Sequence, residues 1–350
     1  MTTPTLTEWQ RLGFEHPLTT LLNRCIHEDP TQRPQTFSEV LQALSLNAPT
    51  TSTVQVPVPK PPRQTPKQES QSTPIVDPAL MADIKAAQQA RYLDQEETWV
   101  NKQDPTRIKI WRKAADQGHA DAQFLMGLYF HFSNADEDYK QAVNWYRKAA
   151  EQGNADGQNT LGDIYGVVEK DYQQAVTWYR KAAEQGDASG QYNLGLMYEE
   201  GLGVEQDYQQ AVTWFRKAAE QGNALGQNKL GLMYEKGFDV QQDYQQAVTW
   251  FRKSAQQGNT YGQYSLGEMY ARGSGVKKDF SQARTWFLEA AKQGDANGQS
   301  SLGYMYENGF GVEQDDRQAV DWYRKAAEQG DDGAKKALRR LKTGLLGKLT

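Results

Sequence analysis

A nine-residue string, Trp-(Tyr/Phe)-Arg-Lys-Ala-Ala-Glu-Gln-Gly, recurs with small changes through the second half of this chain. The glycine that closes it falls every 36 residues from Gly186 onward. The opening tryptophans are Trp145, Trp178, Trp214, Trp250, Trp286 and Trp322, and the closing glycines are Gly118, Gly153, Gly186, Gly222, Gly258, Gly294 and Gly330. A period of this size is typical of stacked helix pairs, which offer an extended binding surface and seldom a reaction centre.

Composition narrows the class of partner and the setting. A net charge of -5 and a pI near 5.6 argue against a nucleic-acid partner. Cys25 is the only cysteine, so no intrachain disulfide can form and a reducing cytoplasm is favoured. The sequence shows neither a basic cap before an apolar run nor a long apolar stretch, so we expect no signal peptide and no membrane partner.

Proline marks the boundaries between regions. Most of the 13 prolines lie in or beside a Pro/Thr/Gln-rich segment, and none occurs after Pro105. Such a composition cannot build a core and predicts a disordered linker. A helix should begin at Pro78 and run to about Trp99, and a second should run from near Pro105 to Gly118. The predicted regions are 1–46 (a short helical fragment), 47–77 (linker), 78–118 (a leading helix pair), 119–330 (the repeats) and 331–350 (a capping helix and tail).

One repeat, from Asp187 to Gly222, shows the expected architecture. A first helix runs from Ala188 to Tyr198, and a loop leads to a second helix that ends near Gln221. Asp207 and Gln210 have capping-box spacing, in which the carboxylate accepts from backbone N–H groups and the glutamine reaches back. The same spacing recurs at Asp138/Gln141, Asp171/Gln174, Asp243/Gln246, Asp279/Gln282 and Asp315/Gln318.

Comparison among the copies separates constant from variable positions. The positions of Ala188, Gln191, Leu194, Gly195 and Tyr198 barely change and lie on one helical face, which we expect to be buried. A mid-helix glycine costs about 1 kcal/mol against alanine, so its recurrence implies close approach of the paired helix. We expect that approach at Trp214 or Ala218, and expect Trp214→Ala to cost about 3–5 kcal/mol.

These residues carry a family resemblance. The motif Ala-x-Gly-Gln-x-x-Leu-Gly-x-Met-Tyr, followed by Gly-x-Gly-Val and the nine-residue string, resembles the SEL-one-like repeat, a relative of tetratricopeptide repeats. The resemblance implies an all-α, right-handed solenoid of antiparallel helix pairs, with six full copies from His119 to Gly330. The loop after Tyr165 is three residues short, and Asp239 breaks the Gly-x-Gly of the fourth copy. Arg339 and Lys342 replace packing residues after the last copy, which predicts a polar cap from Asp331.

The amino-terminal fragment resembles a different family. From about Leu6 to Leu46, with Cys25, Asp29-Pro30 and Arg33-Pro34, it is similar to the end of a protein-kinase C-lobe. The Gly-rich loop, His-Arg-Asp and Asp-Phe-Gly of a kinase are missing, so we expect no catalysis from this chain. A chain cut from a longer kinase-plus-repeat protein is the preferred explanation, and a relic is the other.

No pattern in the sequence predicts a metal, a cofactor or a catalytic residue. None of the four histidines has metal-ligand spacing with another His, Cys or carboxylate. The Gly-x-Gly loops precede an Asp that would repel a phosphate, so they are interpreted as interhelix loops. Pairs such as Arg216-Lys217 form a basic row that we interpret as a solvated face.

The variable positions of the first helix suggest where a partner binds. Ser189, Tyr192, Asn193 and Leu196 lie on one face, and their counterparts include large apolar and aromatic side chains. The predicted protein-binding residues are Phe124, Leu128, Tyr192, Asn193, Leu196, Leu225, Leu232, Tyr261, Tyr264, Glu268 and Tyr304. Because these positions lie away from the constant face, we expect them to add little to stability and to line a concave groove.

The sequence therefore predicts a monomeric, non-catalytic scaffold that binds a peptide or helix of a partner protein, in a signalling context. The alternative is that the chain is the C-terminal piece of a serine/threonine kinase whose repeats dock substrates or regulators. The other interpretation of the variable face is that it is a concave surface that binds no partner.

Overall fold

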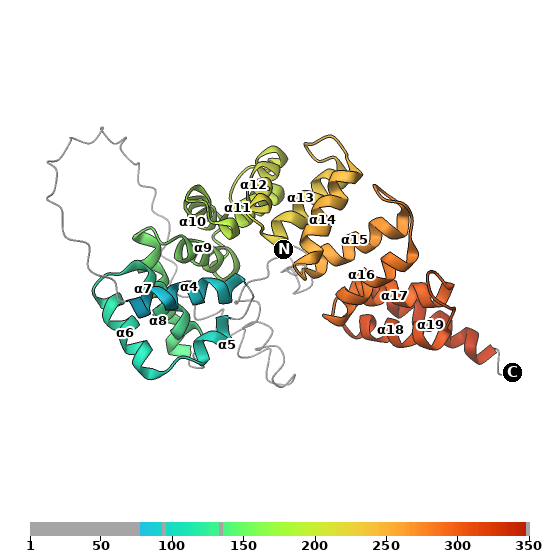
Figure 1. Cartoon of the computed structure of the whole chain (residues 1–350), viewed down its shortest axis with the longest axis horizontal. Coiled ribbons are helices and arrows are strands. Elements are labelled where there is room, and N and C mark those ends of the chain that lie inside the picture. The colour runs from blue at the N-terminus through green and yellow to red at the C-terminus, as the bar shows by residue number, and fades with distance from the viewer. Residues whose placement is uncertain (1–77, 93–95, 133–135, 348–350) are drawn as a thin grey trace, which may run out of the picture. The chain divides into compact units, whose positions relative to one another are not determined.

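The computed structural model describes residues 78–92, 96–132 and 136–347, and every regular element in these ranges is a helix (Figure 1). The predicted kinase-like fragment and linker, residues 1–77, lie outside the described residues. The chain divides into two compact units, Met1–Lys102 and Gln103–Thr350.

The first unit contributes two described helices, α4 (Pro78–Tyr92) and α5 (Glu96–Asn101), which pack on each other. The helix expected from Pro78 to about Trp99 therefore begins where predicted but consists of two helices. The second predicted helix of the leading pair is α6 (Pro105–Asp116), and it groups with the repeats. Asp104 caps α6 by accepting from the N–H groups of Thr106 and Arg107.

The repeats follow in the second unit as pairs of helices, each joined by a loop and packed on the next helix along the chain. This is the all-α solenoid of antiparallel pairs that the sequence predicts. The pairs are α7 (Ala120–His131) with α8 (Asp136–Glu151), α9 (Ala155–Asp163) with α10 (Tyr172–Glu184), α11 (Ala188–Glu200) with α12 (Tyr208–Glu220), α13 (Ala224–Lys236) with α14 (Tyr244–Gln256), α15 (Thr260–Arg272) with α16 (Phe280–Lys292), and α17 (Ala296–Asn308) with α18 (Asp316–Glu328).

The core of each repeat is a ring placed against a glycine. A Cβ built on Gly195 would lie 2.7 Å from the ring of Phe215, and the same close approach recurs in all six copies. The prediction of close approach is confirmed, but its expected partners are wrong. Phe215 is fully buried, whereas Trp214 is half-buried with the ammonium of Lys217 3.9 Å from its ring centroid. Ala218 instead lies against a different glycine, Gly226 of the next repeat.

Helix α6 completes the same pattern. Its Ile110-Trp111-Arg112-Lys113 aligns with Trp-(Tyr/Phe)-Arg-Lys of the later copies, so Trp111 takes the position of Phe215. Trp111 is fully buried, as Phe215 is. Because α6 packs on α7 in the way one repeat packs on the next, it is the second helix of an incomplete repeat.

A glutamine bridge joins the helices of successive repeats. The buried Gln191 of α11 donates from Nε2 to the carbonyl oxygen of Ala183 on the preceding α10 at 3.2 Å. Its Oε1 accepts from Nε2 of Gln221 at 2.7 Å, at the end of α12. Equivalent pairs occur from Gln152–Gln123 to Gln329–Gln299. The constancy of this glutamine therefore follows from three helices sharing one buried amide.

The predicted N-caps are confirmed at most second helices. Asp207 accepts from the backbone N–H of Gln210 at 3.0 Å, as do its counterparts in the second and the last three copies. The N–H of Asp207 itself donates to the carbonyl of Tyr198 at 2.9 Å, which takes the place of the expected return bond from Gln210. The first copy departs from the prediction, because α8 already begins at Asp136 and Asp138 lies within its first turn.

The two irregular loops differ in their backbone conformation. In the second copy, whose loop is three residues shorter, α9 continues into a π-helix, η1 (Ile164–Glu169), in place of the loop. Lys170 then adopts a left-handed φ of 56° before α10. In the fourth copy Asp239 keeps the left-handed backbone of the glycine it replaces, with φ of 50°.

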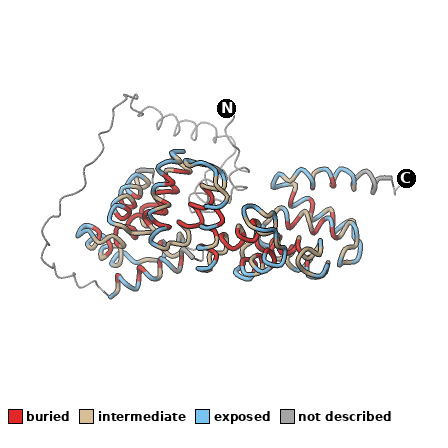
Figure 2. The backbone as a smooth tube through the Cα atoms, turned by 90° about the horizontal axis from the view of Figure 1, so that it is seen from above, coloured by how far each residue is buried: buried red, intermediate tan, exposed pale blue. Residues whose placement is uncertain are grey.

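The array ends on α19 (Asp332–Gly347), which packs on α18 through Ala334 and Ala337. Arg340 of α19 forms an ion pair with Glu307 at 2.6 Å. Figure 2 shows buried backbone positions gathering where successive helices face each other. The polar cap predicted from Arg339 and Lys342 is thus a longer helix than expected.

Candidate protein-binding face

We use "first-helix stripe" for the positions of Ser189, Tyr192, Asn193 and Leu196 and their counterparts in the other five copies. The predicted binding residues all belong to it, on α7, α11, α13, α15 and α17. Each of these helices is fixed at its start by an N-cap or a preceding turn, and in its middle by the glycine contact with its paired helix. The stripe is therefore carried by rigid elements, which is favourable for a binding surface.

The stripe is buried in the amino-terminal copies. The buried residues among those predicted are Phe124, Leu128, Tyr192, Asn193 and Leu196. The rings of Tyr192 and Phe215 lie 5.9 Å apart, and Tyr192 and Leu196 are only 4 % and 1 % exposed. The expectation that these two residues add little to stability is wrong, because burying side chains of this size contributes about 1.5–3 kcal/mol each.

A buried polar cluster on the same face was missed from the sequence. Asp163 of α9 accepts from the hydroxyl of Tyr179 at 2.7 Å and from Nδ2 of Asn193 at 3.2 Å, and Asn193 also donates to Asn159 at 3.0 Å. Burial, reinforced by the nearby Asp163, raises the pKa of Tyr179 well above its ordinary value. The available signal was a carboxylate at a position that is leucine in three other copies.

The stripe opens in the carboxy-terminal copies. Leu225, Leu232, Tyr261, Tyr264 and Glu268 are half-buried, and Tyr304 is 53 % exposed. The large side chains at these positions are therefore within reach of a partner, unlike their counterparts upstream. Of the predicted set, only these six residues can contribute to an open face.

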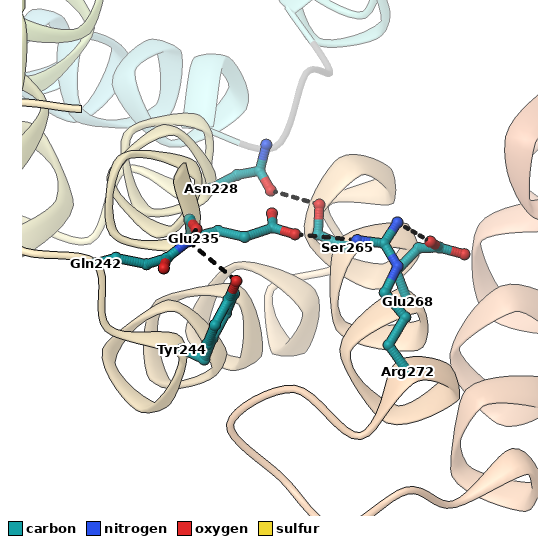
Figure 3. A network of polar contacts seen from close by, with 7 residues as sticks. All are labelled: Asn228, Glu235, Gln242, Tyr244, Ser265, Glu268 and Arg272. Atoms are coloured by element: carbon teal, nitrogen blue, oxygen red, sulfur yellow. Dashed lines mark hydrogen bonds and ion pairs between the residues drawn. The ribbon is translucent and has the colours of Figure 1, made fainter. Parts of the chain in front are cut away.

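Ion pairs and hydrogen bonds join neighbouring first helices along the open stripe (Figure 3). Arg272 of α15 lies between two carboxylates, Glu268 on its own helix and Glu235 on α13, the latter at 3.3 Å. The hydroxyl of Ser265 donates to Oδ1 of Asn228 at 3.3 Å. These contacts hold α15 in register against α13, so Glu268 has a defined position.

The surroundings of Tyr264 are acidic. Its ring packs 5.8 Å from that of Phe287. Burial raises the pKa of Tyr264 to about 12, and the charge of Glu268 adds to the effect while Arg272 opposes it. The carboxylates of Asp295 and Asp331 act in the same direction as Glu268. This part of the stripe combines aromatic rings with negative potential, a chemistry that suits hydrogen-bond donors and cations.

The basic row on the second helices has a structural use. Arg216 is half-buried and donates to the hydroxyl of Tyr234 in the next repeat at 3.2 Å, as Arg180 does to Tyr198. Lys217 lies over Trp214, and the same pair recurs at Trp178, Trp250 and Trp322. The interpretation as a merely solvated face is therefore incomplete.

The residues that the structure describes contain no group of His, Cys, Asp and Glu side chains placed to hold a metal ion. Within the same ranges, no helix has the length and apolar character needed to cross a membrane.

Comparison with known families identifies the repeat. The Sel1 repeat family matches the segments 108–119, 120–154, 155–187, 188–223, 224–259, 260–295 and 296–331. The chain belongs to the Sel1 repeat family. The resemblance read from the motif is thus confirmed, and seven segments match where six copies were expected. The additional segment is the end of α6, in agreement with the place of Trp111 in the packing.

Two solved Sel1-type structures resemble this chain. One is a protective antigen of uropathogenic Escherichia coli that displays an SLR fold, with 38% identity over 75% of this chain and a TM-score of 0.59. The match spans 58% of that antigen. The other is a Sel1 repeat protein from Oxalobacter formigenes, with 36% identity, a TM-score of 0.57, and coverage of 62% of this chain and 86% of that one. No curated protein matches the chain.

Membership of the Sel1 family bears on the two functional predictions. Sel1-repeat proteins generally act as protein-interaction scaffolds, and the Sel1 solenoids that this chain resembles are non-catalytic repeat proteins. The family match does not reach residues 1–46, and the resemblance of that segment to a kinase C-lobe is not supported.

Proposed function

We propose that this Sel1 array is a scaffold that binds a peptide or helix of a partner protein on the open part of the first-helix stripe. Tyr264, Glu268 and Tyr304 are the main anchors, with Tyr261, Leu225 and Leu232 beside them. The partner contributes basic and apolar side chains to this face.

The contrast in exposure along one stripe carries this proposal. At the position where Leu196 is 1 % exposed, the last copy has Tyr304 at 53 % exposure, and the copy before it has the charged Glu268. A tyrosine held open on a rigid helix offers a large amphipathic contact area at low entropic cost. A position with no role beyond solvation would favour small or charged side chains.

The direct experiment replaces the three stripe tyrosines, Tyr261, Tyr264 and Tyr304, by serine and measures affinity for a partner isolated by pull-down with the whole chain. Calorimetric titration should show binding weakened by at least about a hundredfold, since each anchor of this kind is worth about 2 kcal/mol or more. Helicity and melting temperature are measured in parallel.

The matched control replaces three exposed glutamines on the second helices, Gln209, Gln245 and Gln282, by serine. These side chains lie outside the stripe, so their loss should leave the affinity unchanged. Undiminished binding by the tyrosine variant, with its fold intact, would contradict the proposal.

The setting we propose is a monomeric scaffold in the cytoplasm, in a signalling role. The single cysteine, Cys25, supports a reducing compartment. The signalling role rests only on the kinase-like residues of the amino-terminal segment. Light scattering on the purified chain tests the monomer, which should persist at micromolar concentration.

A further inference from the structure

The loops between paired helices form a second series of contacts, separate from the stripe. In each of the last four copies the loop lies on the start of the preceding repeat's second helix. A Cβ on Gly311 would lie 2.7 Å from the carbonyl oxygen of Phe280, and Gly203 and Gly275 approach the carbonyls of Tyr172 and Tyr244 still more closely. This approach places the central residue of the loop over the aromatic residue that begins that helix. In the last copy these residues are Phe310 and Phe280.

We call each of these loop–helix contacts a step. At two steps, an aromatic ring of the loop stacks on the aromatic ring that begins the helix. Phe238 stacks on Tyr208 with centroids 5.1 Å apart and planes at 29°. Phe310 stacks on Phe280 at 4.8 Å and 7°. Tyr208, Phe280 and Phe310 are half-buried as a result. We call the aromatic ring that begins the second helix the platform. The chain itself thus shows the geometry in which a platform accepts an aromatic side chain.

The step between the fourth and fifth copies has the platform but not the second ring. The loop residue there is Ser274, and Tyr244 beneath it is 40 % exposed. The backbone is that of the filled step, since Gly273 and Gly275 have φ of 76° and 68° against 69° and 66° for Gly309 and Gly311. The difference between the steps is therefore the missing side chain.

Tyr244 is also held in place for contact. Nε2 of Gln242 donates to its hydroxyl at 3.0 Å and to the carbonyl of Glu235 at 2.8 Å (Figure 3). Gln206 holds Tyr208, the platform of a filled step, in the same way. The ring of Tyr244 is thus oriented like a platform whose partner is absent.

We propose that the slot over Tyr244 beside Ser274 binds an aromatic side chain of a partner protein, stacked as Phe310 is on Phe280. Offset-stacked rings are favourable beyond the apolar area that they bury. The slot lies on the loops, so it adds a second point of contact to the first-helix stripe and gains from avidity when one partner reaches both.

The test pans a random dodecapeptide phage library against the whole chain, with Ser274→Phe as the counter-selection target. In that variant the loop's own phenylalanine should occupy the slot, so melting temperature should be unchanged or raised while binding is lost. We expect selected peptides to share an aromatic residue at one position and to bind Ser274→Phe and Tyr244→Ala at least about tenfold more weakly than the unaltered chain.

Two controls locate the binding. Phe238→Ser leaves the Tyr244 slot intact and should retain these peptides. A variant with Tyr264 and Tyr304 replaced by serine should also retain them, which separates this slot from the stripe. Peptides without an aromatic consensus, or peptides that bind Ser274→Phe equally well, would overturn the proposal. Self-association of the chain that Ser274→Phe abolishes would also overturn it, by assigning the slot to a second copy.

Discussion

At the residue scale, the repeat depends on a glycine that lets an aromatic ring enter the first helix's surface. The second helix presents two adjacent large rings, Trp214 and Phe215, and only the second meets Gly195. Helical periodicity places both on the apolar side, about 100° apart, so the sequence pattern alone cannot choose between them. The choice follows from which ring the paired helix covers.

Replacement of Gly195 by alanine tests this contact. At an open helical position the change would stabilise the protein by about 1 kcal/mol. Here the added methyl would overlap the Phe215 ring, so we expect a loss of about 1–3 kcal/mol in urea denaturation. The double variant Gly195→Ala/Phe215→Leu should recover part of that loss, and additive effects of the two changes would argue against direct contact.

The two rings themselves should differ in their contribution to stability. Phe215→Ala leaves a cavity in a fully buried site and should cost about 3–5 kcal/mol, whereas Trp214→Ala removes a half-buried ring and a lysine contact and should cost less. Paired thermal melts of the two variants make the comparison. A greater loss from Trp214→Ala would restore the original expectation.

At the element scale, helix starts and ends were largely predictable, and loops were not. The Asp N-caps and the glycine C-caps follow from side-chain chemistry within a few residues, so Asp207 and Gly201 have the conformations that their types favour. The response to a deletion depends on packing with neighbours. The sequence of Tyr165–Lys170 does not itself indicate that the chain forms a π-helix there instead of a short loop. The sequence around Asp239 likewise does not show that this residue retains a left-handed backbone.

Asp239→Gly should stabilise the fourth repeat. A non-glycine residue at φ of 50° is strained, and relief of that strain exceeds the entropy that glycine loses on folding, with a net gain of about 1 kcal/mol. The urea midpoint should rise. The matched reverse change is Gly275→Asp, whose side chain would meet the Tyr244 carbonyl and should lower the midpoint. No rise with Asp239→Gly would mean that the aspartate makes an offsetting contact.

At the scale of the whole molecule, the internal repeat predicts the stack but not which parts of it are open. Five of the six copies carry a large apolar or aromatic side chain on the first-helix stripe, yet Tyr192 is 4 % exposed and Tyr304 is 53 % exposed. That difference depends on what each copy packs against, which the alignment of copies does not contain. The candidate binding face was therefore predictable as a set of positions, and its restriction to the last copies required the structure.

The described helices should fold without the residues before Pro78. The Pro/Thr/Gln-rich composition of residues 47–77 predicts that limited proteolysis cuts there first. The fragment beginning near Pro78 should melt cooperatively, within a few degrees of the whole chain. Loss of the cooperative transition after cleavage would show that residues 1–77 contribute to the fold of the repeats.

Hydrogen–deuterium exchange on the whole chain, with and without its protein partner, tests most directly that the array binds through the open stripe. Slowed exchange should appear in peptides from α15 and α17, which carry Tyr264, Glu268 and Tyr304, while α10 and α12 remain unchanged. Protection confined to the second helices, or to α7 and α11, would contradict the proposed binding face.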